Sequence, residues 1–246
     1  MLGLTGPSVT PTNHLFNVVA TPSGIARFVR DGRFAWPVAV LITLASLPSS
    51  VFGAWARMHF LADPGRFHVL LGVLLGAFAV RLGASALRKP APSRPESPGL
   101  QTRVSGGRLG LLRLEYTFGD QACSAPVPAL ALISLVVGAL GGAAGVGGGA
   151  LVAPLLVSQF RLPVHSIGGA TLLGNFVTSA ASLATFALMG TQDALPDWRL
   201  GLVLGAGGLC GTYLGASLQR RVPTRALVSL LALGTLALSA SYLLRP

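Results

Sequence analysis

A glycine-rich stretch is the first segment of this sequence that could carry out chemistry. It runs from Gly141 to Leu156 as GGAAGVGGGALVAPLL, with three consecutive glycines, Gly147, Gly148 and Gly149, and with Pro154 shortly after them. Consecutive glycines and a nearby proline disfavour a continuous helix. A broken helix exposes backbone N–H groups and a helix N-terminus, which can bind an anion. Glycines also let membrane helices pack closely, so simple packing remains the alternative.

Two short polar stretches are the second candidate for a binding site. Asn17 and Thr21 lie four residues apart, as do Asn175 and Ser179, with Thr178 beside the second pair. On a helix, residues at this spacing share one face. Neutral side chains of these types either hydrogen-bond between membrane helices or line the path of a polar solute. Because the two stretches match each other in the internal repeat described below, we favour a pathway lining.

Other residue types give little sign of chemistry. No Ser/His, Cys/His or paired-carboxylate arrangement is visible, so the sequence predicts no enzyme and no cofactor. The histidines lack the spacing of metal ligands, and we interpret them as polar or interfacial residues and predict no metal site. Cys123 and Cys210 lack a disulfide or metal pattern. Arg81 lies inside an apolar run but close to its end, where an arginine can extend to the membrane surface.

Long apolar runs are the elements that must position these residues. The chain has 246 residues, of which 52% are hydrophobic and only 10% charged, whereas soluble proteins carry about 25% charged residues. Crossing ~30 Å of hydrocarbon takes about 20 helical residues, and the alternating pattern of a membrane β-barrel is absent. About seven candidate spans lie near 10–30, 34–57, 66–87, 127–158, 164–189, 198–219 and 224–244. The sequence therefore predicts an all-α, polytopic transmembrane helical bundle, in which the glycines break or kink the overlong span at 127–158.

The net charge of +11 does not indicate a nucleic-acid partner. The arginines lie between apolar runs rather than in one patch, as expected for residues that anchor helices at a membrane surface. We expect a multi-pass protein of the inner (plasma) membrane that contacts the lipid bilayer and can form a homo-oligomer. The arginines do not decide which end of the bundle faces the cytoplasm.

An internal repeat divides the chain. Trp36 and Gly53 match Trp198 and Gly215 with identical spacing, and Asn17 matches Asn175 approximately. We predict a first transmembrane repeat at 1–87, a polar linker or small hairpin at 88–126, and a second repeat at 127–246. The second repeat begins with the glycine-rich span, and the first repeat has no counterpart of it. Many secondary transporters consist of two such halves with the substrate held between them.

The segment GALGGAAGVGGGALVAPLLVSQFRLPVHSIGGATLLGNFVTSAASL resembles the repeat signature of the sulfite exporter TauE/SafE family. The segment VTPTNHLFNVVATPSGIARFVRDGRFAWP resembles the corresponding part of a first repeat. The departure from the family pattern is the missing first glycine-rich span, which implies either a start codon assigned too late or a shortened member of the family.

The resemblance implies a permease for small anions such as sulfite, an organosulfonate or a related organic anion, working by alternating access. It places the substrate site on Gly147, Gly148, Gly149, Pro154, Asn175 and Thr178 of the second half and on Asn17 and Thr21 of the first half. The alternative function is a non-transporting membrane assembly partner or sensor.

Overall fold

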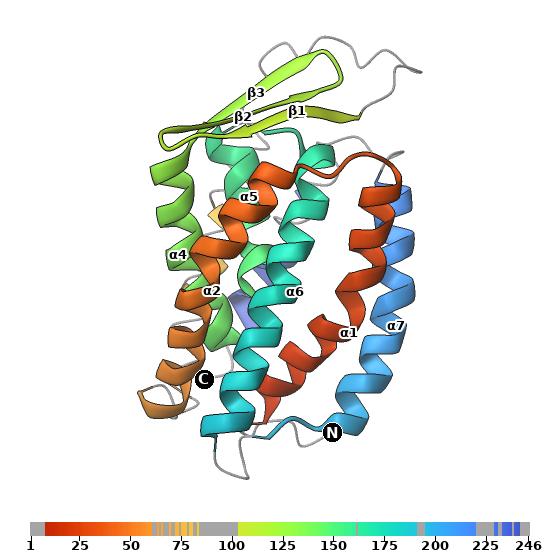
Figure 1. The fold of residues 1–246 in the computed structure, drawn as a ribbon. Helices are drawn as coiled ribbons and strands as arrows, with labels where there is room; N and C mark the ends of the chain where they lie inside the picture. The colour runs from red at the N-terminus through yellow and green to blue at the C-terminus, as the bar shows by residue number, and fades with distance from the viewer. Residues whose placement is uncertain are drawn as a thin grey trace.

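The fold is that of a computed structural model, which describes residues 8–60, 103–160, 162–190 and 195–219 and scattered residues between 63 and 83 and between 229 and 241. Figure 1 shows long helices that run side by side, with a small sheet across one end. The elements are α1 (Val9–Arg30), α2 (Trp36–His59), β1 (Val104–Leu109), β2 (Arg113–Phe118), β3 (Gln121–Pro126), α4 (Val127–Ala144), α5 (Gly148–Phe160), α6 (Val164–Met189) and α7 (Trp198–Leu218).

The predicted all-α membrane bundle is confirmed as the main class. Within the described residues, α2, α4, α6 and α7 are each long and apolar enough to cross a membrane. Large apolar side chains such as Leu44, Phe52, Leu132 and Val203 are exposed on these helices, as expected where helices face lipid. Of the other predicted spans, α1 occupies the first, and most of 66–87 and 224–244 lies outside the described residues together with Arg81.

The predicted break of the long span at 127–158 is also confirmed. It is divided into α4 and α5, which are separated by Gly145, Val146 and Gly147. A proline inside a helix does not break it everywhere in this chain, because α1 contains Pro22 and is one helix from Val9 to Arg30. Glycine content alone does not determine the break either, because α7 is also glycine-rich and remains one helix.

Small residues set the packing of the helices. α1 packs against α6 and α7, while α2 packs against α4 and α6. On α7, Gly201 and Gly205 leave room for Leu15 and Val19 of α1. On α4, Gly138 and Gly142 lie against the serines of α2. Such close approach is the usual means of helix association in lipid, where apolar burial provides little driving force.

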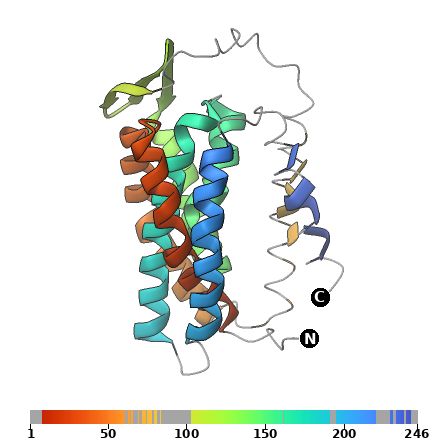
Figure 2. The same ribbon diagram turned by 90° about the vertical axis from the view of Figure 1, so that its right-hand side faces the viewer.

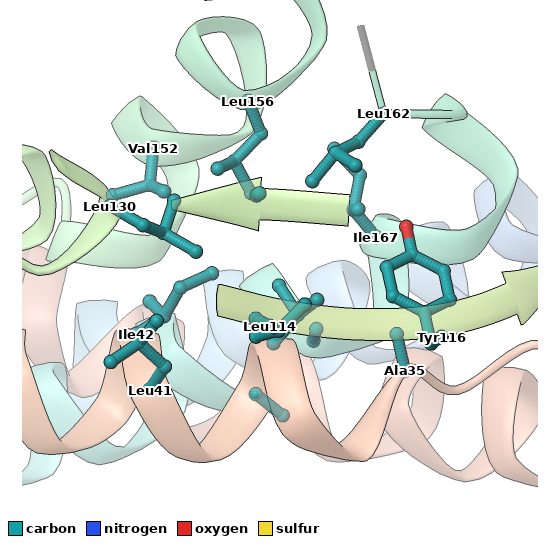
Figure 3. Packing of buried hydrophobic residues seen from close by; sticks show 14 of the residues in the cluster. Ala35, Leu41, Ile42, Leu114, Tyr116, Leu130, Val152, Leu156, Leu162 and Ile167 are labelled. Atoms are coloured by element: carbon teal, nitrogen blue, oxygen red, sulfur yellow. The ribbon is translucent and has the colours of Figure 1, made fainter. Parts of the chain in front are cut away.

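The predicted linker or hairpin at 88–126 contains a three-stranded antiparallel sheet in the order β1-β2-β3, and residues 88–102 lie outside the described residues. Leu114 and Tyr116 of β2 are buried and face the helices (Figure 3). They join a core whose other members include Ile42, Leu130 and Ile167, from three different helices. The Tyr116 hydroxyl lies 2.8 Å from Ser166 Oγ of α6. The sheet is thus fixed to the helices over one end of the bundle (Figure 2).

Short helical pieces lie beside this bundle (Figure 2). Ser239 Oγ donates a hydrogen bond of 2.8 Å to the carbonyl oxygen of Gly72 and so joins two of these pieces. Leu75 packs against Ala144 at the end of α4. These contacts place Leu75 of the third predicted span beside the glycine break and join the last predicted span to the third.

Cys123 offers a chemical test of the sheet's packing. Desolvation by burial raises the pKa of its thiol, which an interaction with Tyr116 only partly offsets. Because the thiolate is the reactive form, we expect iodoacetamide to modify Cys123 slowly near pH 8 and faster as the pH rises further. Mass spectrometry of the modified protein would measure the rate. Modification of the folded protein at the rate measured in denaturant would contradict this position of the sheet.

Candidate functional site

The break between α4 and α5 is a tight glycine turn in the middle of the bundle. α4 ends at Ala144, Gly145 follows with a φ of 76°, and Gly147 has a φ of 77°. Both angles lie in the left-handed region that glycine adopts without strain. The backbone N–H of Gly147 donates to the carbonyl oxygen of Gly141 at 3.2 Å. α5 then begins at Gly148, so its N-terminal N–H groups lie inside the protein.

α1 holds one side of this turn. Asn17 Nδ2 donates two hydrogen bonds of 3.2 Å, to the carbonyl oxygens of Gly145 and Val146. One turn earlier, His14 is fully buried, and its Nε2 lies 3.0 Å from the carbonyl oxygen of Gly142. Carbonyl groups freed by the break thus find partners on α1, as buried backbone groups must.

α6 holds the other side. Thr178 Oγ1 accepts a hydrogen bond of 3.1 Å from the N–H of Gly148 and donates one of 2.7 Å to the carbonyl oxygen of Gly174 on its own helix. Gly149 lies against the backbone of α6 at Thr171 and Asn175, where a Cβ atom would clash. The triple glycine is therefore needed for close approach as well as for the turn.

Two polar atoms beside Gly147 are buried without a hydrogen-bond partner among the described residues. They are Asn175 Oδ1 and Ser179 Oγ of α6, and both lie next to the position that a Cβ atom of Gly147 would occupy. Buried polar groups of proteins are nearly always paired, so unpaired ones at a helix N-terminus indicate a site for a polar ligand. The Ser179 hydroxyl can donate to an anion, and the Asn175 amide can do so when its NH₂ faces the site.

The structure brings most of the predicted site residues together. Around the break lie Asn17, Gly147, Gly148, Gly149, Asn175, Thr178 and Ser179. Thr21 is buried one turn away, and its hydroxyl donates to the carbonyl oxygen of Asn17 in its own helix. Pro154 lies within α5, in its second turn and beyond its first N–H groups.

His14 is a neighbour of the site that its residue type and spacing did not indicate. It was interpreted as a polar or interfacial residue, whereas its ring is buried against α4 and Phe186. Its Nδ1, like Asn175 Oδ1 and Ser179 Oγ, is buried without a hydrogen-bond partner in the described part of the chain. The signal that could have identified it is its position one helical turn before Asn17, which places both on one face of α1.

Thr178 allows a test of the contact between the break and α6. Replacing it with valine keeps the shape but removes the acceptor of the Gly148 N–H, and we expect a loss of about 1–3 kcal/mol in the free energy of unfolding. Thr178→Ser retains the hydroxyl and should lose clearly less. Thermal unfolding in detergent would compare the two variants. Equal losses would show that the hydroxyl is not the partner of Gly148.

Comparisons with known proteins were consistent with one another. The family described as "Sulfite exporter TauE/SafE" matches residues 1–243. The probable membrane transporter protein y4hK of Sinorhizobium fredii (strain NBRC 101917 / NGR234) is 24% identical over 220 residues, 87% of this chain and 75% of that protein. The probable membrane transporter protein YunE of Bacillus subtilis (strain 168) is 25% identical over 233 residues, 92% of this chain and 77% of that protein. No solved structure matches the chain.

Proposed function

The chain belongs to the sulfite exporter TauE/SafE family and is a membrane transporter of that type, and we propose that it is a permease for small anions, with sulfite, an organosulfonate or a related organic anion as substrate. The observation that carries this proposal is that two buried atoms at the N-terminus of α5, Asn175 Oδ1 and Ser179 Oγ, have no hydrogen-bond partner in the part of the chain that the structure describes.

The chemistry of this place favours an anion. No lysine or arginine occurs between Gln121 and Phe160 or between Leu162 and Gln192, so α4, α5 and α6 offer no permanently charged basic side chain to neutralise the substrate. Its charge must instead be met by N–H groups at the start of α5, whose dipole is positive at that end. The Ser179 hydroxyl and the Asn175 amide would replace part of the hydration shell.

The arrangement of helices supports a two-sided mechanism. The predicted repeat relates α1 to α6 and α2 to α7. If the repeat is present, α2 should contact α6 in the same way that α1 contacts α7. Both pairs of helices are in contact. A substrate beside Gly147 has α1 on one side and α6 on the other. Rocking of the halves around this position would open it to each face of a plasma (inner) membrane in turn.

Counterflow of labelled sulfite in proteoliposomes tests the proposal, and Ser179→Ala is the most informative variant. Because Ser179 Oγ has no protein partner among the described residues, its removal should leave stability nearly unchanged. Loss of one hydrogen bond to a charged substrate should weaken transport about tenfold.

Ser182→Ala is the matched control. The Ser182 hydroxyl already donates to the carbonyl oxygen of Ser50, at 3.3 Å, so its loss should lower stability slightly and leave counterflow nearly unchanged. Absence of counterflow with every sulfur oxyanion tested would refute the substrate class. It would also favour the alternative of an assembly partner or sensor.

A further inference from the structure

The β1–β2 hairpin carries an apolar tip outside the helices. Leu111 is 93% exposed, Leu112 74% and Leu109 45%. Arg108 and Arg113 bracket these leucines in the sequence and are also exposed. The opposite side of the sheet is already packed against the bundle, so these leucines have no place in the protein core. Adjacent leucines at a turn are unfavourable in water and suggest contact with another apolar phase.

The tip is fixed to the start of a predicted membrane span. The N–H of Val127, the first residue of α4, donates to the carbonyl oxygen of Leu112 at 3.0 Å. Arg113 also pairs with Pro126, directly before that helix. Figure 1 shows the turn beside the beginning of α4, at the edge of the bundle. The apolar tip therefore adjoins the start of α4, a helix whose Leu132 and Leu135 are also exposed.

Tryptophans indicate the level of the membrane surface. Trp36, at the start of α2, is 59% exposed, and Trp55 lies near the other end of that helix. Their separation of 19 positions corresponds to about 28 Å of helix, close to the thickness of the hydrocarbon region. Tryptophan favours the two interfaces of a bilayer. Because β1 packs on the first turn of α2 through Gly107 and Pro37, the hairpin lies at the Trp36 interface.

We propose that the β1–β2 turn is an anchor that binds phospholipid at this interface. Leu109, Leu111 and Leu112 insert beside α4 at the boundary of the acyl chains, and Arg108 and Arg113 bind headgroup phosphates. An apolar surface flanked by arginines is the usual composition of an interfacial anchor, and arginine binds phosphate through two parallel hydrogen bonds. Arg30 and Arg103, two further exposed arginines at this end of the described bundle, favour anionic lipid.

The test is a fluorescent label at the tip of the full-length protein in vesicles of phosphatidylcholine and phosphatidylglycerol. With both native cysteines replaced by alanine, Leu111→Cys is labelled with an environment-sensitive fluorophore. We expect blue-shifted emission that is quenched several-fold more by lipid carrying a nitroxide near the headgroup than by aqueous iodide. The control is Asp120→Cys, at the exposed β2–β3 turn, where iodide should quench more strongly.

The arginines require a second measurement. In the labelled Leu111→Cys protein, Arg108→Gln with Arg113→Gln should reduce the difference in emission between vesicles with and without phosphatidylglycerol. Iodide quenching of the Leu111 label as strong as at Asp120 would refute the anchor. Protection from both quenchers, with energy transfer between labelled copies, would assign the tip to a second copy of the chain instead. Neither result depends on transport activity, so the proposal stands or fails separately from the anion site.

Discussion

Gly147→Ala is expected to destabilise the protein by about 2–5 kcal/mol and to abolish transport. The φ of Gly147 is 77°, and an alanine held in this conformation costs about 1–2 kcal/mol. Its Cβ would also fall on Asn175 Oδ1 and lie 2.8 Å from Ser179 Oγ. Crowding of a packed interior adds about 1–3 kcal/mol. Thermal unfolding in detergent and counterflow in proteoliposomes would measure the two effects.

Two further variants separate strain from crowding. Gly106 also has a left-handed φ, of 61°, but has open space around it, so Gly106→Ala should show the backbone strain alone. Asn175→Ala in the Gly147→Ala background removes the crowded amide and should restore part of the lost stability, but not transport. If Gly147→Ala costs no more than Gly106→Ala, the close approach of Gly147 to α6 is refuted.

The general position of the break was predictable, whereas its geometry was not. Consecutive glycines and a proline indicated that one helix could not span 127–158, and α4 and α5 are indeed separate. However, Gly148 and Gly149 are the first residues of α5, and the left-handed positions are Gly145 and Gly147. Glycine adopts several conformations at little cost. The choice among them comes from partners on α1 and α6, which are distant in sequence.

Helical spacing predicted that Asn175, Thr178 and Ser179 share one face of α6, and all three lie beside the glycine turn; their role as a substrate site stays a prediction. It could not predict that Thr178 already bonds to Gly148 while Ser179 has no partner among the described residues. This difference separates a residue that holds the turn from one available to a substrate. Only the distance between helices determines it, and no local pattern in the sequence encodes that distance.

The sheet was predictable only as a short polar segment with partial alternation. Its strand order and its burial depend on the helices beneath it, since Leu114 and Tyr116 are buried against residues far away in the chain. The two-repeat architecture stays a prediction. The matching contacts of α1 with α7 and of α2 with α6 support it. However, the contact of α4 with α2 has no counterpart on α7 among the described residues.

Asn17→Asp is expected to be the most damaging change on the α1 side of the site. The Asn17 amide donates to the carbonyl oxygens of both Gly145 and Val146. An ionised aspartate has no donor and places a negative charge against these two oxygens. We expect loss of transport and a decrease of more than about 3 kcal/mol in the free energy of unfolding, because an unpaired charge is added to two unsatisfied carbonyl groups.

Asn17→Ala distinguishes lost donation from added repulsion. It removes both hydrogen bonds without adding charge, so it should cost only about 1–3 kcal/mol. Acidification protonates the carboxyl group of the Asn17→Asp variant and restores one donor, so that variant should recover stability at low pH while Asn17→Ala does not. Unfolding measured from pH 4 to 8 would show this difference. If the two variants remain equal across the range, Asn17 does not hold the turn by donation, and α1 must position the break through packing alone.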